Sequence, residues 1–344
     1  MSLLETYKQE IRTVMPPAIQ RDEWRYTRYG LLTATKEMTN SAMSIINDDL
    51  KQKALASEGR DLGIPVMKMG DMVIKNQRSC TIGDFDNETE IITLTWSTLV
   101  LDIHMVKSQY AKNELSYLQD LNKKLEKADH TFAKAVEDLI YAKLDTEKSP
   151  IYASPLVPTK YPLVGDAMQV AVVQQDKFFN DLEVIMQGDD FYSMPFKVLG
   201  STTLQADVND YGNQGANNDE NTAFQFGGFD FRFSNHLVTA TRATGFCMTD
   251  GSIGILTRIN QDSVDGNITT DGTEWSITSM PTFGFDVGVQ YKSTCTDLSG
   301  VAGLEHLEAT MVERWQFSVD VAIVTPYNSD PATKAGVIKK FEFI

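Results

Sequence analysis

The sequence predicts an α+β fold with more than one lobe. Its 344 residues exceed what a single compact core usually holds. Residues 113–145 space their apolar side chains three and four apart, which indicates an amphipathic helix, whereas residues 91–97 alternate apolar and polar side chains, which indicates a strand. Helical and strand patterns are mixed along the chain, which favours an α+β arrangement. Apolar residues make up 42% of the chain, enough to bury a core.

The first sixty residues predict an arm that packs on another surface. A short amphipathic stripe ends at Pro16 and Pro17, and a weaker helical pattern covers residues 31–55. Between them, residues 21–29 interleave arginine with aromatic side chains. Such a mixture stacks on nucleotide bases in some proteins, but arginine and tyrosine are also enriched at protein interfaces, and we favour an interface.

Residues 61–98 predict a long β-hairpin. Residues 66–75 and 91–97 have the composition of strands, and the polar residues 78–90 between them form a soft tip. The tip resembles a calcium loop only in its acidic residues. Counted from Asp84, Thr89 stands where that loop needs glycine and Thr95 where it needs glutamate.

Residues 113–145 predict one helix about 45 Å long. A coiled coil and a single helix lying on a sheet both fit its apolar row, which includes several alanines and lasts only about four heptads. The predicted row consists of Leu118, Leu121, Leu125, Ala128, Phe132, Ala135, Leu139 and Ala142.

Four prolines between residues 150 and 162 end this helix and predict a domain boundary. A second helix is expected at residues 166–186, and a short one at residues 252–259. Phe229, Phe231 and Phe233 alternate with Asp230 and Arg232, so a strand there places three phenylalanines on one face. Further strands are expected at residues 283–291 and 315–324.

The sequence predicts no catalytic site, no metal site and no cofactor. It lacks a phosphate-binding GxxxxGK[ST] loop, a GxGxxG motif, an HExxH motif and a GxSxG elbow. Its three cysteines form no CxxC pair. A net charge of −16 and a pI of 4.7 argue against a protein that grips nucleic acid or anionic lipid. No signal peptide or membrane-spanning run is apparent.

The order of these segments resembles the major capsid proteins of tailed bacteriophages, which have the HK-97 fold. The resemblance is carried by the hairpin at residues 63–97, the helix with its entry at residues 102–144, and the closing strand at residues 315–325. It implies an N-terminal arm (1–60), an extended loop (61–98), a peripheral domain with a spine helix (99–162), an axial domain (163–260) and return strands (261–344).

The resemblance also implies a function. The chain would be a structural protein of the virion and not an enzyme. It would assemble in the host cytoplasm into pentamers and hexamers of an icosahedral shell that encloses double-stranded DNA, with portal, scaffold and decoration proteins as further partners. Because the sequence starts at Met1, we expect no removal of an N-terminal segment. The expected assembly-interface residues are Arg21, Trp24, Arg25, Arg28, Lys68, Lys75, Arg78, Asp84 and Asp86.

Three alternatives remain at this point. An encapsulin-type shell shares the fold and holds enzyme cargo, a soluble acidic hydrolase would form a small oligomer, and a tail or baseplate protein would form tubes or rings. Charge is unevenly distributed: residues 1–78 carry a net +2, and residues 150–344 carry −13. An arm and hairpin could therefore dock on the acidic lobes of neighbouring subunits.

Overall fold

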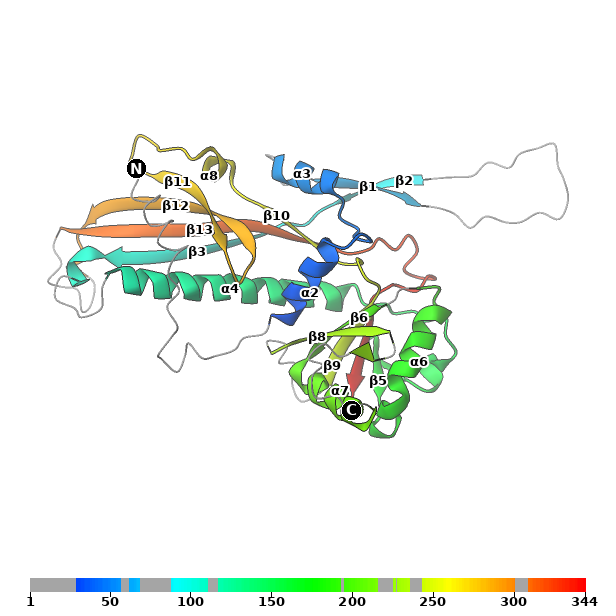
Figure 1. Cartoon of the computed structure of the whole chain (residues 1–344). Coiled ribbons are helices and arrows are strands. Elements are labelled where there is room, and N and C mark those ends of the chain that lie inside the picture. Colours follow the sequence, from blue (N-terminus) through cyan, green and yellow to red (C-terminus); the bar gives the residue numbers. More distant parts are fainter. Residues whose placement is uncertain are drawn as a thin grey trace, which may run out of the picture. The chain divides into compact units, whose positions relative to one another are not determined.

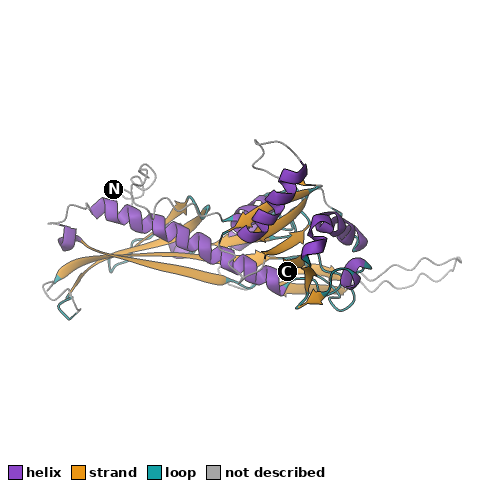
Figure 2. Ribbon diagram, turned by 90° about the horizontal axis from the view of Figure 1, so that it is seen from below, coloured by secondary structure: helices purple, strands orange, loops and turns teal. Residues whose placement is uncertain are grey.

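The computed structural model describes residues 29–56, 62–68, 88–110, 117–192, 195–215, 225–226, 228–235, 243–300 and 309–344. It has the mixed helix and strand content that the sequence predicts (Figures 1 and 2). Two compact units are distinguished, and each is described by itself. The first unit contains Trp96–Asp138 and Leu256–Ala322, and the second contains the other described residues. The four prolines at 150–162 lie inside the second unit, and the five-part division stays a prediction.

The first unit is built on a five-stranded sheet. Its strands are β3 (Ser97–Val106), β10 (Gly254–Arg258), β11 (Glu274–Met280), β12 (Phe285–Thr296) and β13 (Thr310–Val324). Their order is β10-β13-β12-β11, and β3 also pairs with β13. The strands predicted at 283–291 and 315–324 are confirmed by β12 and β13. The helix predicted at 252–259 is wrong, because a short apolar run fits a buried strand as well as a helix. A short helix, α8 (Gln261–Asp265), follows β10.

The long helix is confirmed as α4 (Tyr117–Thr146), which follows the short turn η2 (Lys107–Tyr110). It lies along the sheet of the first unit (Figure 2). The carboxylate of Asp129 accepts the backbone N–H groups of Thr282 at 2.8 Å and Phe283 at 2.7 Å. The rings of Phe132 and Phe283 stack with centroids 5.9 Å apart. The single helix on a sheet is therefore the arrangement that this chain adopts.

The apolar row predicted for this helix is right in its middle and wrong toward both ends, and Leu118, its first member, is 38% exposed. Leu121, Leu125, Ala128 and Phe132 are buried, but Ala142 is exposed and Ala135 and Leu139 are only half-buried. The predicted row repeats every seven residues, and a straight α-helix drifts by ~20° per heptad relative to such a row. The buried face therefore continues through a different set of residues: Ala133, Val136, Ile140 and Leu144.

The second unit contains a mixed seven-stranded sheet in the order β4-β5-β14-β9-β6-β8-β7. The strands are β4 (Leu163–Val164), β5 (Ala167–Val170), β6 (Phe196–Ser201), β7 (Gln225–Phe226), β8 (Phe229–Ser234), β9 (Ala243–Met248) and β14 (Lys339–Phe343). Because β5 occupies residues 167–170, the helix predicted at 166–186 begins too early. The observed elements there are η3 (Val172–Gln174) and α6 (Gln175–Gly188). β5 pairs in parallel with β14, a partner that local periodicity could not reveal.

Helices cover both faces of this sheet (Figure 1). On one face, α6 and α7 (Thr202–Gly215) pack on Phe229, Phe231 and the aromatic residues of β14. The predicted phenylalanine face of the strand at 229–233 is thus confirmed. On the other face lie α2 (Gly30–Thr39), which contacts β6 and β8, and the end of α4, where Tyr141 contacts Phe246 of β9. Two further short helices are α3 (Asp48–Ala56) and α5 (Leu156–Thr159).

The base of the predicted hairpin is confirmed. β1 (Gly63–Lys68) pairs antiparallel with β2 (Glu88–Thr93), and the two form a separate two-stranded sheet. Residues 69–87, which include the predicted tip, lie outside the described residues.

Candidate functional site

The segment from α2 to residue 46 is fixed onto the sheet of the second unit by close backbone contacts. A Cβ atom added at Gly30 would lie 2.2 Å from the carbonyl oxygen of Phe233, so only glycine fits at this crossing. At the other end of the segment, the backbone N–H of Ile45 donates to the carbonyl of Gly251 at 3.0 Å. Gly251 has φ of +75° and would bring a Cβ within 2.3 Å of the Met43 oxygen. Both contacts require glycine.

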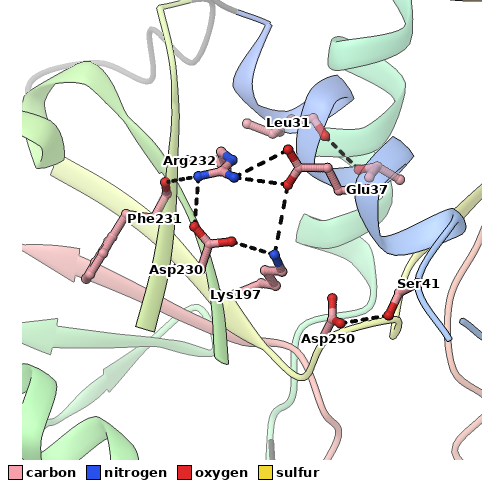
Figure 3. Close-up of polar contacts among 9 residues, drawn as sticks. Leu31, Glu37, Ser41, Lys197, Asp230, Phe231, Arg232 and Asp250 are labelled. Atoms are coloured by element: carbon pink, nitrogen blue, oxygen red, sulfur yellow. Dashed lines mark hydrogen bonds and ion pairs between the residues drawn. The ribbon is translucent and has the colours of Figure 1, made fainter. Parts of the chain in front are cut away.

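Four charged side chains join α2 to the same sheet (Figure 3). Arg232 donates to both carboxylate oxygens of Glu37, at 3.2 and 3.3 Å, and to Asp230 at 2.8 Å. Lys197 lies 2.5 Å from Asp230 and 3.9 Å from Glu37. Lys197 and Asp230 are opposite each other in the parallel pair of β6 and β8. The cluster carries two positive and two negative charges, so its net charge is zero.

This cluster holds the helix in place. Its side chains range from 11% exposed at Lys197 to 40% exposed at Glu37, and networks of this kind stabilise more than isolated surface pairs. Thr39 adds a buried contact, because its hydroxyl accepts the backbone N–H of Ile255 at 3.0 Å. Ser41 donates to Asp250 at 2.8 Å. The described segment from α2 to Ser41 is therefore anchored at several points on the rest of the second unit.

A second anchor holds the C-terminal strand. Lys339 of β14 and Asp189, at the end of α6, form an ion pair whose side chains are both 0% exposed. The Lys339 ammonium also lies 3.3 Å from the carbonyl oxygen of Ile151 and 4.2 Å from the ring centroid of Tyr152. Burial lowers the pKa of Lys339, and the hydrogen bond to Asp189 opposes that shift. The pair joins three segments that are distant in sequence.

The buried acids of the first unit have structural partners. Glu313 is 1% exposed, lies 2.6 Å from the ammonium of Lys107 and accepts the hydroxyl of Tyr291 at 3.0 Å and that of Tyr117. Burial, followed by the hydrogen bond to Asp120, raises the pKa of Tyr110 to about 12.

Within the described ranges, no group of three or more histidine, cysteine or acidic residues is placed to hold a metal ion. No described helix is long and apolar enough to cross a membrane.

The hairpin base leaves an apolar side chain uncovered. Ile91 of β2 is 71% exposed. The hydrogen bond from the Tyr327 hydroxyl to Glu90, at 2.6 Å, links β2 to the C-terminal segment of the same unit. Two strands bury too little surface to be stable alone in water, so this hairpin is suited to pack on a further surface.

One of the nine predicted interface residues, Lys68, belongs to the described residues. Lys68 ends β1, where its backbone pairs opposite Glu88. The other eight lie outside the described residues: Arg21, Trp24, Arg25, Arg28, Lys75, Arg78, Asp84 and Asp86.

Sequence reasoning missed the anchor of α2. The alternation of Asp230 and Arg232 with phenylalanines showed that two charges share one face of the strand, but Glu37, a partner of Arg232, is 195 residues away from it in sequence.

Comparison with known proteins shows the fold. No protein-family model matches the sequence, and no curated protein matches it. Among solved structures, a chain of the "Cyanophage Pam1 capsid asymmetric unit" matches with a TM-score of 0.54 at 11% identity, over 96% of this chain and 98% of that chain. This chain has the fold of a phage capsid protein.

Chains from two further phages match over a similar extent. A chain from Mycobacterium phage Che8 matches with a TM-score of 0.52 at 9% identity, over 95% of both chains. One from Gordonia phage Cozz matches with a TM-score of 0.50 at 10% identity, over 96% of this chain and 92% of that one. The matches extend over nearly the whole chain, so the capsid fold accounts for both compact units and not for one alone.

Proposed function

We propose that this chain is the major capsid protein of a tailed bacteriophage, a structural protein of the virion with no catalytic role. The observation that carries the proposal is the match of nearly the full chain to the Pam1 capsid chain. Copies would assemble in the host cytoplasm as pentamers and hexamers of one icosahedral shell of the HK-97 type, enclosing double-stranded DNA. The portal, scaffold and decoration proteins of such a shell are further proposed partners.

The geometry of the second unit supports this role. The hairpin of β1 and β2 is a separate two-stranded sheet with an exposed isoleucine, so a neighbouring subunit would supply the surface that stabilises it. The arm that precedes α2 would reach a neighbour from the anchor at Glu37, Lys197, Asp230 and Arg232. The nine predicted interface residues, from Arg21 to Asp86, belong to these two proposed contacts.

The experiment begins with expression of the full chain, followed by size-exclusion chromatography and negative-stain microscopy. We expect megadalton shells or rings of capsomers. A stable monomer or dimer under all conditions, with a scaffold protein supplied, would contradict the proposal.

A shortened hairpin tests the assembly contact separately from folding. Because Lys68 and Glu88 are opposite each other in the register, residues 69–87 can be replaced by Asn-Gly, the preferred two-residue hairpin turn. We expect an unchanged circular dichroism spectrum and melting temperature, with loss of closed shells. A control of natural length, with residues 69–87 changed to glycine and serine, distinguishes the reach of the loop from its sequence. Closed shells from the shortened variant would refute the hairpin assignment.

A further inference from the structure

A row of basic side chains crosses the sheet of the first unit. His104 of β3 is opposite Arg314 of β13, and Arg314 is opposite Lys292 of β12. Side chains that are opposite each other in adjacent strands share a face, so the three groups lie side by side on the face that does not carry α4. Their neighbours in sequence, Met105 and Trp315, are buried, and the sulfur of Met105 contacts Lys124 of α4.

This arrangement is unfavourable for the fold by itself. Arg314 and Lys292 are directly opposed, and like charges in that position destabilise a sheet. Lys292 is compensated by Asp271 at 2.5 Å. Over the ranges that the structure describes, the side chains of Arg314 and His104 have no ion-pair or hydrogen-bond partner, although the chain has 47 acidic residues and 31 basic ones. An exposed arginine without a carboxylate partner is therefore notable in this protein.

The row lines a cavity of about 250 Å³. The side chains of Gln290 and Gln316, which are opposite each other in the next row, also line it, as does Asp102. The Gln316 amide donates to Asp102 at 2.9 Å, so that carboxylate is already engaged. The cavity thus presents a guanidinium and an imidazole beside amide groups. The guanidinium of an arginine binds the oxygens of a carboxylate or a phosphate with two parallel hydrogen bonds.

The carboxylates of Asp102 and Asp271 would repel a ligand that brings many negative charges to this cavity. Duplex DNA carries one charge per ~1.7 Å of its axis, and it would bring further phosphates against both acids. A single oxyanion avoids that repulsion. The most abundant source in a shell would be the acidic surface of the chain itself, because the net charge is −16.

We infer that this cavity binds one carboxylate side chain of a second copy of this chain, with Arg314 as the main ligand. The inference rests on the proposed function, since it requires copies packed against each other. It adds an electrostatic contact on the first unit that is independent of the hairpin and the arm.

The first test is charge reversal, R314E, in the full chain. The control is K134E, which makes the same charge change at an exposed lysine of α4. R314E removes the like-charge contact with Lys292, so we expect a melting temperature equal to or above that of the wild type. We expect the yield of shells from R314E to fall about tenfold or more, whereas K134E keeps the wild-type yield. Wild-type yield from R314E would overturn the inference while leaving the proposed function intact. Absence of shells from the wild type would overturn both.

The second test identifies the partner. In the R314K variant, a water-soluble carbodiimide joins the new amine to any carboxylate in contact with it. Shells assembled from mixed ¹⁴N- and ¹⁵N-labelled chains are treated and digested for mass spectrometry. We expect crosslinked peptides that combine one light and one heavy chain. Crosslinks confined to Asp102 or Asp271 of the same chain would overturn the inference. So would shells without crosslinks at residue 314 whose formation depends on added inorganic phosphate, because a free anion would then be the occupant.

Discussion

The ion pair of Lys339 and Asp189 gives the sharpest stability prediction. In K339M the hydrophobic chain fills nearly the same volume, but the carboxylate of Asp189 stays buried with the backbone N–H of Ala153 at 2.5 Å as a remaining partner. Both side chains of the natural pair are 0% exposed. Removal of one partner of a buried pair costs about 3–5 kcal/mol. Since ~1 kcal/mol shifts the melting temperature by ~2–4 °C for a body of 150–250 residues, we expect a decrease of roughly 6–20 °C.

The double variant K339M/D189L separates the charge from the packing. Replacement of a whole buried pair by apolar side chains is often neutral or stabilising, so the double variant should recover most of the loss. The assay is thermal unfolding of the purified full chain, with hydrogen exchange of the β14 amides to show that the loss is at this strand. A shift below ~2 °C in K339M, or a double variant at least as unstable as the sum of the single ones, would refute the reasoning.

Three further predictions follow from the described contacts. I140A should lower the free energy of unfolding by about 2–5 kcal/mol, because Ile140 is 0% exposed. In the same denaturant titration, L139A should lower it much less. Equal losses would show that Leu139 belongs to the buried face, as the seven-residue row predicted. G30A should cost about 1–3 kcal/mol by overpacking against the Phe233 carbonyl, whereas G300A, which meets nothing within 4 Å, should leave the melting temperature unchanged. Burial alone would raise the pKa of Asp181, but hydrogen bonds from Lys160 and Tyr161 lower it overall. Its stabilising contribution is therefore present above the unfolded pKa of ~3.9 and lost as pH falls through the lower folded pKa. Melting temperatures of wild type and D181N should converge as pH falls from 6 to 3; a constant difference would contradict this assignment.

The sequence determined those features that depend on neighbours along the chain. The extent of α4, the base of the hairpin, the phenylalanine face of β8 and the strands β12 and β13 all follow from periodicity within ten to thirty residues. The segment order was sufficient to indicate a capsid fold even though no motif marks it. The buried residues in the second half of α4 were predicted less well. A row that repeats every seven residues drifts away from the buried face of a helix with 3.6 residues per turn over four heptads.

The tertiary structure alone decided which distant residues meet. β14 completes the seven-stranded sheet next to β5, so residues 167–170 are a strand in spite of their helical pattern. Glu37 meets Arg232, and Lys339 meets Asp189, because sheet order and not sequence separation sets their distance. The row of His104, Arg314 and Lys292 exists only in the register of three strands. The sequence determines which charged side chains are present. Whether two of them repel each other, pair or form a site depends on the distance between them, and that distance is set only when the strands of the sheet are paired.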